Sequence, residues 1–568
     1  MKTAKDGANT CDVIVIGSGI SGGWAAKELC EKGLKTLVLE RGPNVEHIKD
    51  YHTMNMDVWD FKYRGYSSRE EREMQLKQGR TGFATYPSHR HWFVNDVDHP
   101  YNEVKRFDWI RGYQVGGRSI TWGRQSYRLS DDDFSANLKD GIAVDWPVRY
   151  KDIAPWYDYV ETHIGVSGEN LGLSQLPDGK LLPPMQMNCP EKFFQKKIAE
   201  HYSDRVVTIG RTANLTGDKP FKGRSKCQFR NRCMRGCPYG AYFSSLSSTL
   251  PAAAETGNLT LRPNSIVHSV IYDDKLGKAT GVRVIDAETK EEFEYFAKVI
   301  FCCASTVGTA AILLNSTSER FPNGLGNDSG ELGHNLMDHH HRAGALGIFE
   351  GFEDKYYKGR RPNILYVPRF RNISDASPEV DFLRGYGFTC TIDRGNLTQS
   401  APELSFGQEL KEKLTVPGPW RIWLTGFGEI LPYHENRMFL DYSKRDKWGL
   451  PTVTFDCELK QNEHKMRRDM VLRATEMLEV AGIKDIESFD WGSPMGLGIH
   501  EMGTARMGRD PNTSVLNGYN QIHSVPNVFV TDGAFMTSSA CQNPSLTYMA
   551  FTARAANYAA AQLKQGAL

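Results

Sequence analysis

Short hydrophobic runs separated by glycine-rich turns mark the start of the chain. Residues Asp12–Ile16 read DVIVI, a β-branched run typical of a buried strand. Ala25, Ala26 and Leu29 follow at helical spacing, and the helix is predicted to end near Gly33. A second strand is predicted over 35–39. The pattern therefore predicts a β–α–β unit at residues 12–39.

Later segments alternate hydrophobic and polar residues, as half-buried strands do. This alternation appears in 363–372, 421–431 and 437–443, and helical spacing appears over 463–481. These segments predict an antiparallel sheet with a helix. Residues 44–105 are rich in Tyr, His, Arg and Trp without clear periodicity. They predict a long loop or arm that covers a cofactor or contacts a partner.

Composition narrows the class of protein. A chain of 568 residues is too long to fold around one hydrophobic core, so two or more domains are expected. A net charge of +1 gives no general attraction to nucleic acid or anionic membranes. No apolar segment approaches the length of a membrane span, and the first residues do not read as an export signal. Eleven cysteines, thinly spread, argue against a disulfide framework.

The first turn has the spacing of a dinucleotide site. Gly17, Gly19 and Gly22 form a GxGxxG pattern between the first strand and the helix. Their tasks are the tight turn, close approach to a pyrophosphate, and helix–strand packing. The helix N-terminus attracts the phosphates, and Glu40 at the end of the second strand suits ribose hydroxyls. The pattern predicts NAD or FAD without deciding between them.

Three further segments carry a family resemblance. They are GYQVGGRSITWGRQSYRLS (112–130), VIFCCASTVGTAAILLNS (299–316), and HEMGTARMG (500–508) with the block at 527–560. Together with the first turn they resemble the glucose–methanol–choline (GMC) oxidoreductases, which implies FAD as the cofactor. Residues 436–463 and the QNPSLT sequence resemble the subgroup of pyranose oxidase and bacterial glucoside 3-dehydrogenases.

The resemblance implies a fold and a set of cofactor contacts. The expected fold class is α/β, with a Rossmann-type FAD-binding domain (10–165, 225–335 and 490–565) interleaved with an α+β substrate domain on an antiparallel sheet (166–224 and 336–489). Pyranose oxidase links its flavin to a histidine where this chain has Thr121, so non-covalent FAD is expected. The predicted cofactor-binding residues are Gly17, Ser18, Gly19, Gly22, Glu40, Arg41, Gly116, Gly117, Ser119, Trp122, Gly123, Val267, Asp532, Gly533, Asn543, Pro544 and Ser545. For Val267 an ordinary buried strand valine is the alternative.

Oxidation of an alcohol by hydride transfer needs a base for the hydroxyl proton, and histidine titrates near neutrality. The resemblance assigns this base to His500 and a substrate hydrogen bond to Asn543. The alternative is that His500 is an ordinary core histidine. His339, His340 and His341 resemble a metal tract, but consecutive strand residues point to opposite faces, so a structural role bordering the substrate pocket is expected.

Three cysteines lie close together in CQFRNRCMRGCPYGA. Cys227, Cys233 and Cys237 match a segment that holds a 3Fe–4S cluster in bacterial FAD glucose dehydrogenases, which this stretch resembles. Zinc, a redox disulfide and plain structural thiols are the alternatives. Arg230, Arg232 and Arg235 either offset cluster charge or form a solvated face.

The expected function is an FAD-dependent sugar dehydrogenase that oxidises a secondary ring hydroxyl of glucose or glucosides, with carbon 3 preferred. Glucose 1-dehydrogenase and pyranose 2-oxidase are the alternatives, and a non-catalytic electron-transfer flavoprotein is a more remote one. The resemblance implies a small export subunit, a cytochrome c or other electron acceptor, and a periplasmic location. Glu429, Tyr433 and Gly498 are candidate pocket residues.

Overall fold

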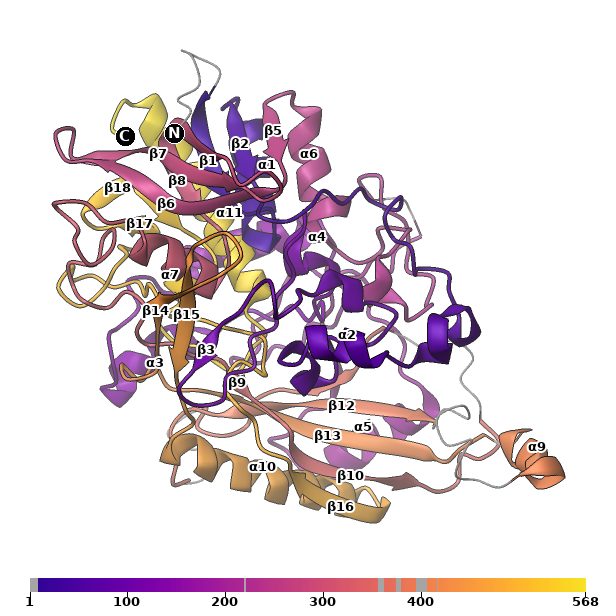
Figure 1. Cartoon of the computed structure of the whole chain (residues 1–568). Helices are drawn as coiled ribbons and strands as arrows, with labels where there is room; N and C mark the ends of the chain where they lie inside the picture. The colour runs from indigo at the N-terminus through magenta and orange to yellow at the C-terminus, as the bar shows by residue number, and fades with distance from the viewer. Residues whose placement is uncertain (1–8, 219–220, 356–361, 374–379, 395–405, 416) are drawn as a thin grey trace.

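The computed structural model describes the chain except residues 1–8, 219–220, 356–361, 374–379, 395–405 and 416. Two large sheets dominate it (Figure 1). The first contains the strands at both ends of the chain, and the second is built from its middle. The described part of the chain begins at the first sheet, and the C-terminus lies near it (Figure 1). Among the described residues, no helix is both long and apolar enough to cross a membrane.

The first sheet has eight strands, and its core is parallel. Strands run in the order β17-β18-β8-β1-β2-β5; β7 pairs with the first half of β8, and β6 pairs with β7. β1, β2, β5, β8 and β18 pair in parallel, while β6, β7 and β17 are antiparallel additions. The bounds are β1 Thr10–Ile16, β2 Thr36–Leu39, β5 Leu259–Arg262, β6 Ser265–Asp273, β7 Lys278–Asp286, β8 Glu292–Cys302, β17 Gln521–Ile522 and β18 Val525–Val530.

Helices cover this sheet, so the central part of the predicted β–α–β unit is buried. The last four residues of β1 and all of β2 are buried, as expected for parallel strands with both faces covered. α1 packs on α6 and α11, and α11 also packs on α4. The bounds are α1 Ile20–Glu31, α3 Asp131–Asp140, α4 Tyr150–Ile164, α6 Thr249–Glu255, α7 Thr306–Leu314 and α11 Ser545–Lys564.

The second sheet is antiparallel and has seven strands. Their order is β16-β10-β13-β12-β11-β4, with β9 added to one end of β13. Burial alternates along β13, and α10 covers one face of the sheet (Figure 1). The predicted antiparallel sheet and its helix are therefore present. The bounds are β4 Thr208–Ile209, β9 His339–His340, β10 Ala343–Phe349, β11 Leu365–Val367, β12 Tyr386–Arg394, β13 Trp420–Glu429, β16 Lys484–Asp490, α5 Cys189–His201, α9 Gly407–Thr415 and α10 Gln461–Val480.

A small third sheet joins the arm to the middle of the chain. β14 (Arg437–Arg445) pairs with β15 (Pro451–Asp456), and β15 pairs with β3 (Asn102–Glu103). The segment 437–443 is thus a strand, but it lies outside the seven-stranded sheet. Residues 44–105 contain only short elements, among them α2 (Arg69–Met74) and β3. The domain limits expected from the sequence stay a prediction.

Candidate active site

A cavity of about 610 Å³ lies where segments distant in sequence meet. Its wall includes the turn after β1, the end of β2, the loop at 109–125 and the segment at 498–501. The second sheet contributes Phe427, and the arm contributes Thr81, Phe83, Phe93, His99 and Pro100. The arm therefore borders the same cavity as the glycine-rich turn.

Each of the three glycines of the first turn is needed for a different structural reason. Gly17 has a positive φ of 95°, and a Cβ there would lie 2.6 Å from the carbonyl oxygen of Cys303. A Cβ on Gly22 would lie 1.9 Å from the carbonyl oxygen of Gly17, so α1 crosses the turn closely. A Cβ on Gly19 would meet no described atom within 4 Å, because Gly19 borders the cavity. This is the division of tasks expected for a pyrophosphate site.

The N-terminus of α1 is open to an anion. Its cap residue Gly19 makes no side-chain capping bond, and the first turn has no acidic residue. Its N–H groups and helix dipole therefore point positive charge toward the cavity.

Glu40 is held at the end of β2 by a local network. Its carboxylate accepts hydrogen bonds from the N–H and hydroxyl of Ser18, at 3.1 and 2.6 Å, and from the N–H of Gly42 at 3.0 Å. Burial raises its pKa. Ser18 also accepts a bond from Gly116 N–H, which connects the first turn to the loop at 109–125. Arg41 lies over the rings of Tyr113 and Trp448.

Most of the predicted cofactor residues line the cavity. Those that do are Gly17, Ser18, Gly19, Glu40, Arg41, Gly117, Ser119, Trp122, Gly123, Val267, Asp532, Gly533, Asn543 and Ser545. Gly22, Gly116 and Pro544 do not. Gly116 supports the loop from behind, since a Cβ there would press on Leu246, and Pro544 caps α11. Thr121 also borders the cavity.

Several cavity residues were not predicted from the sequence. Buried nitrogens of His99, Arg111 and His268 border the cavity without a hydrogen-bond partner among the described residues, as does one of Arg41, which the sequence did predict. Such atoms are costly when left unpaired, so they suit the acceptor groups of a bound ligand. Together with the open helix N-terminus and Glu40, they fit a dinucleotide such as FAD. His99 lies in the arm and Arg111 follows it. Because the arm sequence has no periodicity, nothing in the sequence indicated which of its side chains face the cavity.

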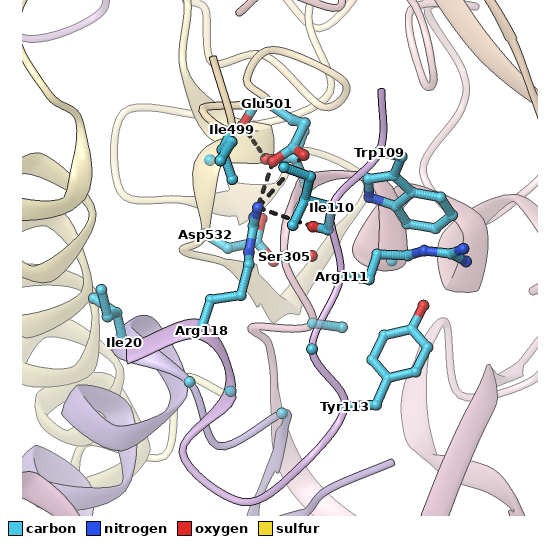
Figure 2. A pocket seen from close by; sticks show the side chains of 18 of the residues that line it. Ile20, Trp109, Ile110, Arg111, Tyr113, Arg118, Ser305, Ile499, Glu501 and Asp532 are labelled. Carbon is cyan, nitrogen blue, oxygen red and sulfur yellow. Dashed lines mark hydrogen bonds and ion pairs between the residues drawn. The ribbon is translucent and has the colours of Figure 1, made fainter. Parts of the chain in front are cut away.

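An ion pair stabilises the segment beside His500. Arg118 reaches Glu501 with an Nη2–Oε2 distance of 2.9 Å and also donates to the carbonyl of Ile110 (Figure 2). The Glu501 side chain is 2% exposed and that of Arg118 is 27% exposed, so the carboxylate is buried while the guanidinium keeps some contact with solvent. It connects the loop at 109–125 to the segment at 498–501, which belong to distant parts of the sequence.

The two predicted catalytic residues lie side by side in the cavity wall. Asn543 Nδ2 is 3.5 Å from His500 Nε2. On the other side of the ring, His500 Nδ1 lies 2.9 Å from His339 Nδ1. Burial lowers the pKa of His500 well below its ordinary value, so its imidazole is neutral.

The three consecutive histidines have different surroundings. His339 contacts His500, and His341 lines the cavity. His340 is fully buried on the other side, against Gly428. They do not converge, and no trio of His, Cys, Asp or Glu among the described residues is arranged to hold a metal ion.

Two of the three further pocket candidates do not line the cavity. Glu429 is buried behind it and faces Arg384, and Tyr433 donates to the carboxylate of Glu463. These two side chains instead satisfy buried partners away from the cavity wall. Phe427, two residues before Glu429 on β13, lines the cavity instead, and Gly498 also lines it.

The three clustered cysteines lie beside the main cavity. Cys227, Cys233 and Cys237 are free thiols that share one small cavity, while Met234 lines the large one. Burial raises the pKa of Cys227 to about 11. A metal group bound here would require the thiols to approach one another.

The arginines of this segment contact the arm. Arg230 donates to the carbonyl of Met54, Arg232 pairs with Asp57, and Arg235 donates to the carbonyl of Met56. They are therefore not simply a solvated face. They fasten the cysteine segment to residues 54–57.

The sequence of this chain matches the protein family described as GMC oxidoreductase over residues 12–341 and 432–552. The chain belongs to this family. Its chemistry is accordingly that of an FAD-dependent oxidoreductase acting on alcohol groups, which confirms the prediction at this level.

Relatives and solved structures agree over nearly the whole length. Fructose dehydrogenase large subunit of Gluconobacter japonicus is 26% identical, covering 98% of this chain and 99% of its own. 2-Methyl-1,2-propanediol dehydrogenase of Mycolicibacterium austroafricanum is 28% identical, covering 97% and 95%. Pyridoxine 4-oxidase from Mesorbium loti has a TM-score of 0.59 at 17% identity, covering 96% and 99%. The expected fold class is therefore confirmed.

Proposed function

We propose that this GMC oxidoreductase is a sugar dehydrogenase that oxidises a secondary ring hydroxyl of glucose or a glucoside at carbon 3, giving a 3-keto-sugar. The observation that carries the proposal is the neutral His500 beside Asn543 in the cavity wall. Glucose 1-dehydrogenase and pyranose 2-oxidase are the alternatives within the same chemistry.

The relatives support a sugar substrate more than a simple alcohol. Fructose dehydrogenase and paromamine 6'-oxidase, the latter from Streptomyces fradiae and 26% identical over 98% of this chain, are named for sugar-containing substrates. Position 3 has narrower support. C-glycoside 3-oxidase of Arthrobacter globiformis is 32% identical, but over 24% of this chain.

The side chains divide the work of alcohol oxidation. The Nε2 lone pair of neutral His500 takes the hydroxyl proton, because imidazole basicity is suited to this step. Asn543 Nδ2 lies close enough to donate a hydrogen bond to the same substrate oxygen. Bound FAD would supply the acceptor for the hydride that leaves the carbon. The residues that would hold it are those of the first turn, Glu40 and the loop at 109–125, and Thr121 offers no histidine for a covalent link.

The test compares two sugars without oxygen. Purified holoenzyme is mixed anaerobically with glucose or methyl glucoside, flavin bleaching is followed, and the new carbonyl is located by NMR. A keto group at carbon 3 of both sugars is expected. A lactone from glucose with no reaction of methyl glucoside would overturn the assignment of carbon 3.

Variants separate catalysis from a passive flavoprotein. His500→Ala should slow flavin reduction by about 10²- to 10⁴-fold, the usual value of a general base. His201→Ala, at an exposed site, serves as the matched control. Unchanged flavin reduction in His500→Ala would favour the non-catalytic alternative.

We further propose that Cys227, Cys233 and Cys237 hold a 3Fe–4S cluster, which would supply one-electron transfer to an acceptor other than oxygen. Their shared cavity supports this, and loading would bring the three thiols closer together. Iron and acid-labile sulfide are measured in anaerobically purified protein, with Cys189→Ser, an exposed thiol, as the control for Cys233→Ser. Less than about one iron per chain would contradict the cluster.

A small export subunit, a cytochrome c acceptor and a periplasmic location complete the proposal. The name of the fructose dehydrogenase relative, a large subunit, supports a multi-subunit enzyme. Co-expression with the neighbouring genes of the source genome, followed by affinity purification and cell fractionation, tests all three. Recovery of the chain alone from the cytoplasmic fraction would contradict the export and partner predictions.

A further inference from the structure

His339 contacts the proposed base on the side away from the cavity. We propose that His339 is a positioning residue that fixes the tautomer of His500, so that the proton sits on Nδ1 and the Nε2 lone pair faces the cavity. This inference rests on the proposed role of His500 as the base. It concerns a residue that the sequence pattern placed only at the border of the pocket.

A chain of hydrogen bonds determines the tautomer. His339 Nε2 lies 2.8 Å from the carbonyl oxygen of Ala540. A carbonyl oxygen can only accept, so His339 must carry its proton on Nε2. A neutral imidazole has one N–H group, which leaves His339 Nδ1 as an acceptor.

The same logic passes to His500. Its Nδ1 is 2.9 Å from His339 Nδ1, and two bare nitrogens would not form a hydrogen bond. His500 Nδ1 must therefore donate, and His500 Nε2 keeps its lone pair. That nitrogen is the one beside Asn543 Nδ2, a donor. The hydrogen bonds at both ends of this series, to Ala540 and to Asn543, are therefore satisfied by the same arrangement of protons.

The backbone around this pair is held in an unfavourable conformation. Ile499 has a φ of 60° and Ala540 a φ of 55°, and neither is glycine. A β-branched residue at positive φ is a genuine outlier, and such strain persists only where the surroundings impose it. These two residues lie next to the base and at the carbonyl that anchors His339.

Asp338 supplies the constraint on the backbone. Its carboxylate accepts the N–H groups of Gly498 and His500, at 2.9 and 3.0 Å, on either side of Ile499. Asp338 is fully buried and precedes β9, which pairs with the end of β13. Consecutive residues thus hold the backbone and the ring of His500.

Replacing His339 by two different amides separates the two contacts. In His339→Asn the side-chain oxygen can reach the place of Nδ1 and accept from His500. In His339→Gln the amide reaches the place of Nε2, so it can keep the bond to Ala540 but not the one to His500. His464→Gln, at an exposed site on α10, is the matched control.

The first readout is the rate constant of flavin reduction under anaerobic substrate saturation, together with the apparent substrate Kd. We expect His339→Gln to lose about a hundredfold in the rate constant with little change in Kd, and His339→Asn to stay within about tenfold of the unchanged protein. Equal losses in both variants, or a loss confined to Kd, would overturn the positioning role.

The second readout needs no substrate and no variant of His339. Solid-state NMR of holoenzyme with ¹⁵N-labelled histidine distinguishes protonated from bare ring nitrogens, and His500→Gln identifies the His500 signals. A protonated Nδ1 and a bare Nε2 are expected at neutral pH. A proton on Nε2 of His500 would overturn the inference. The expected tautomer in a protein that oxidises no sugar would instead contradict the proposed function alone.

Discussion

Replacing single glycines of the first turn by alanine should separate folding from cofactor binding. Gly17→Ala requires a non-glycine residue at φ 95° and places its methyl group 2.6 Å from the backbone oxygen of Cys303. The backbone strain and the overlap each cost about 1–3 kcal/mol, so a loss of about 4 kcal/mol in unfolding free energy is expected. Gly22→Ala belongs to the same class, with its methyl group 1.9 Å from the oxygen of Gly17.

Gly19→Ala should behave in the opposite way. Gly19 has a φ of −67°, which alanine adopts freely, and its added methyl group meets no described protein atom within 4 Å. The unfolding free energy without cofactor should fall by only about 0.5 kcal/mol, the cost of alanine at an N-cap. The methyl group would occupy the space over the N-terminus of α1. A loss of about 3 kcal/mol in FAD binding, roughly a hundredfold in Kd, is expected because charged-group hydrogen bonds to the helix are lost.

The assay is a pair of measurements on each variant. Urea unfolding of FAD-stripped protein gives stability, and titration of that protein with FAD, followed by flavin fluorescence, gives Kd. Gly33→Ala, at a positive φ of 82° with open surroundings, controls for backbone strain alone. The reasoning is refuted if Gly19→Ala binds FAD with the Kd of the unchanged protein, or if Gly17→Ala unfolds at the same urea concentration as the unchanged protein.

Three further predictions concern charge. The flavin-reduction rate should stay level between about pH 8 and about pH 6, because His500 is already neutral there; an ascending limb near about pH 6.5 in stopped-flow measurements would contradict this. Stability should fall on acidification, because burial lowers the pKa values of His339 and His341 to about 4. The unfolded chain takes up protons first, below about pH 6.5, so each histidine lowers the unfolding free energy by up to roughly 3 kcal/mol by about pH 4. A thermal unfolding temperature that does not change between these pH values would contradict this. Arg128→Met should lower the free energy of urea unfolding by about 3–5 kcal/mol, because it leaves Glu161, which is 0% exposed, without its ion-pair partner. Lys197→Met, which breaks a surface ion pair, should cost under about 1 kcal/mol. Similar losses in the two variants would contradict this.

Local rules made the first turn predictable. Gly17, Gly19, Gly22 and Glu40 lie within one β–α–β unit, where spacing alone determines which atoms meet. The contact between His339 and His500 joins residues 161 positions apart, and no spacing rule reaches that far. Strand alternation did predict that neighbouring histidines face opposite ways, but not which face borders the site.

The position of Glu429 and the details of the arm could not be predicted for the same physical reason. Glu429 was named as a candidate pocket residue, yet Arg384, 45 positions away, satisfies its carboxylate in the interior. The arm lacked any period because it contains few regular elements, and its contribution to the cavity depends on where β3 pairs with β15. Tertiary partners, rather than local preference, determine both outcomes.

The distribution of the cavity wall along the chain has a consequence for biosynthesis. Its first contributing residue is Ile16 and its last is Tyr548. A nascent chain lacks part of the wall until residue 548 has left the ribosome, and contacts between such distant segments form slowly. Insertion of the flavin is therefore a late event that follows translation of residue 548. A cell short of flavin would accumulate finished chains with an incomplete interior, so flavin supply would limit the yield of active protein without changing the rate of its synthesis.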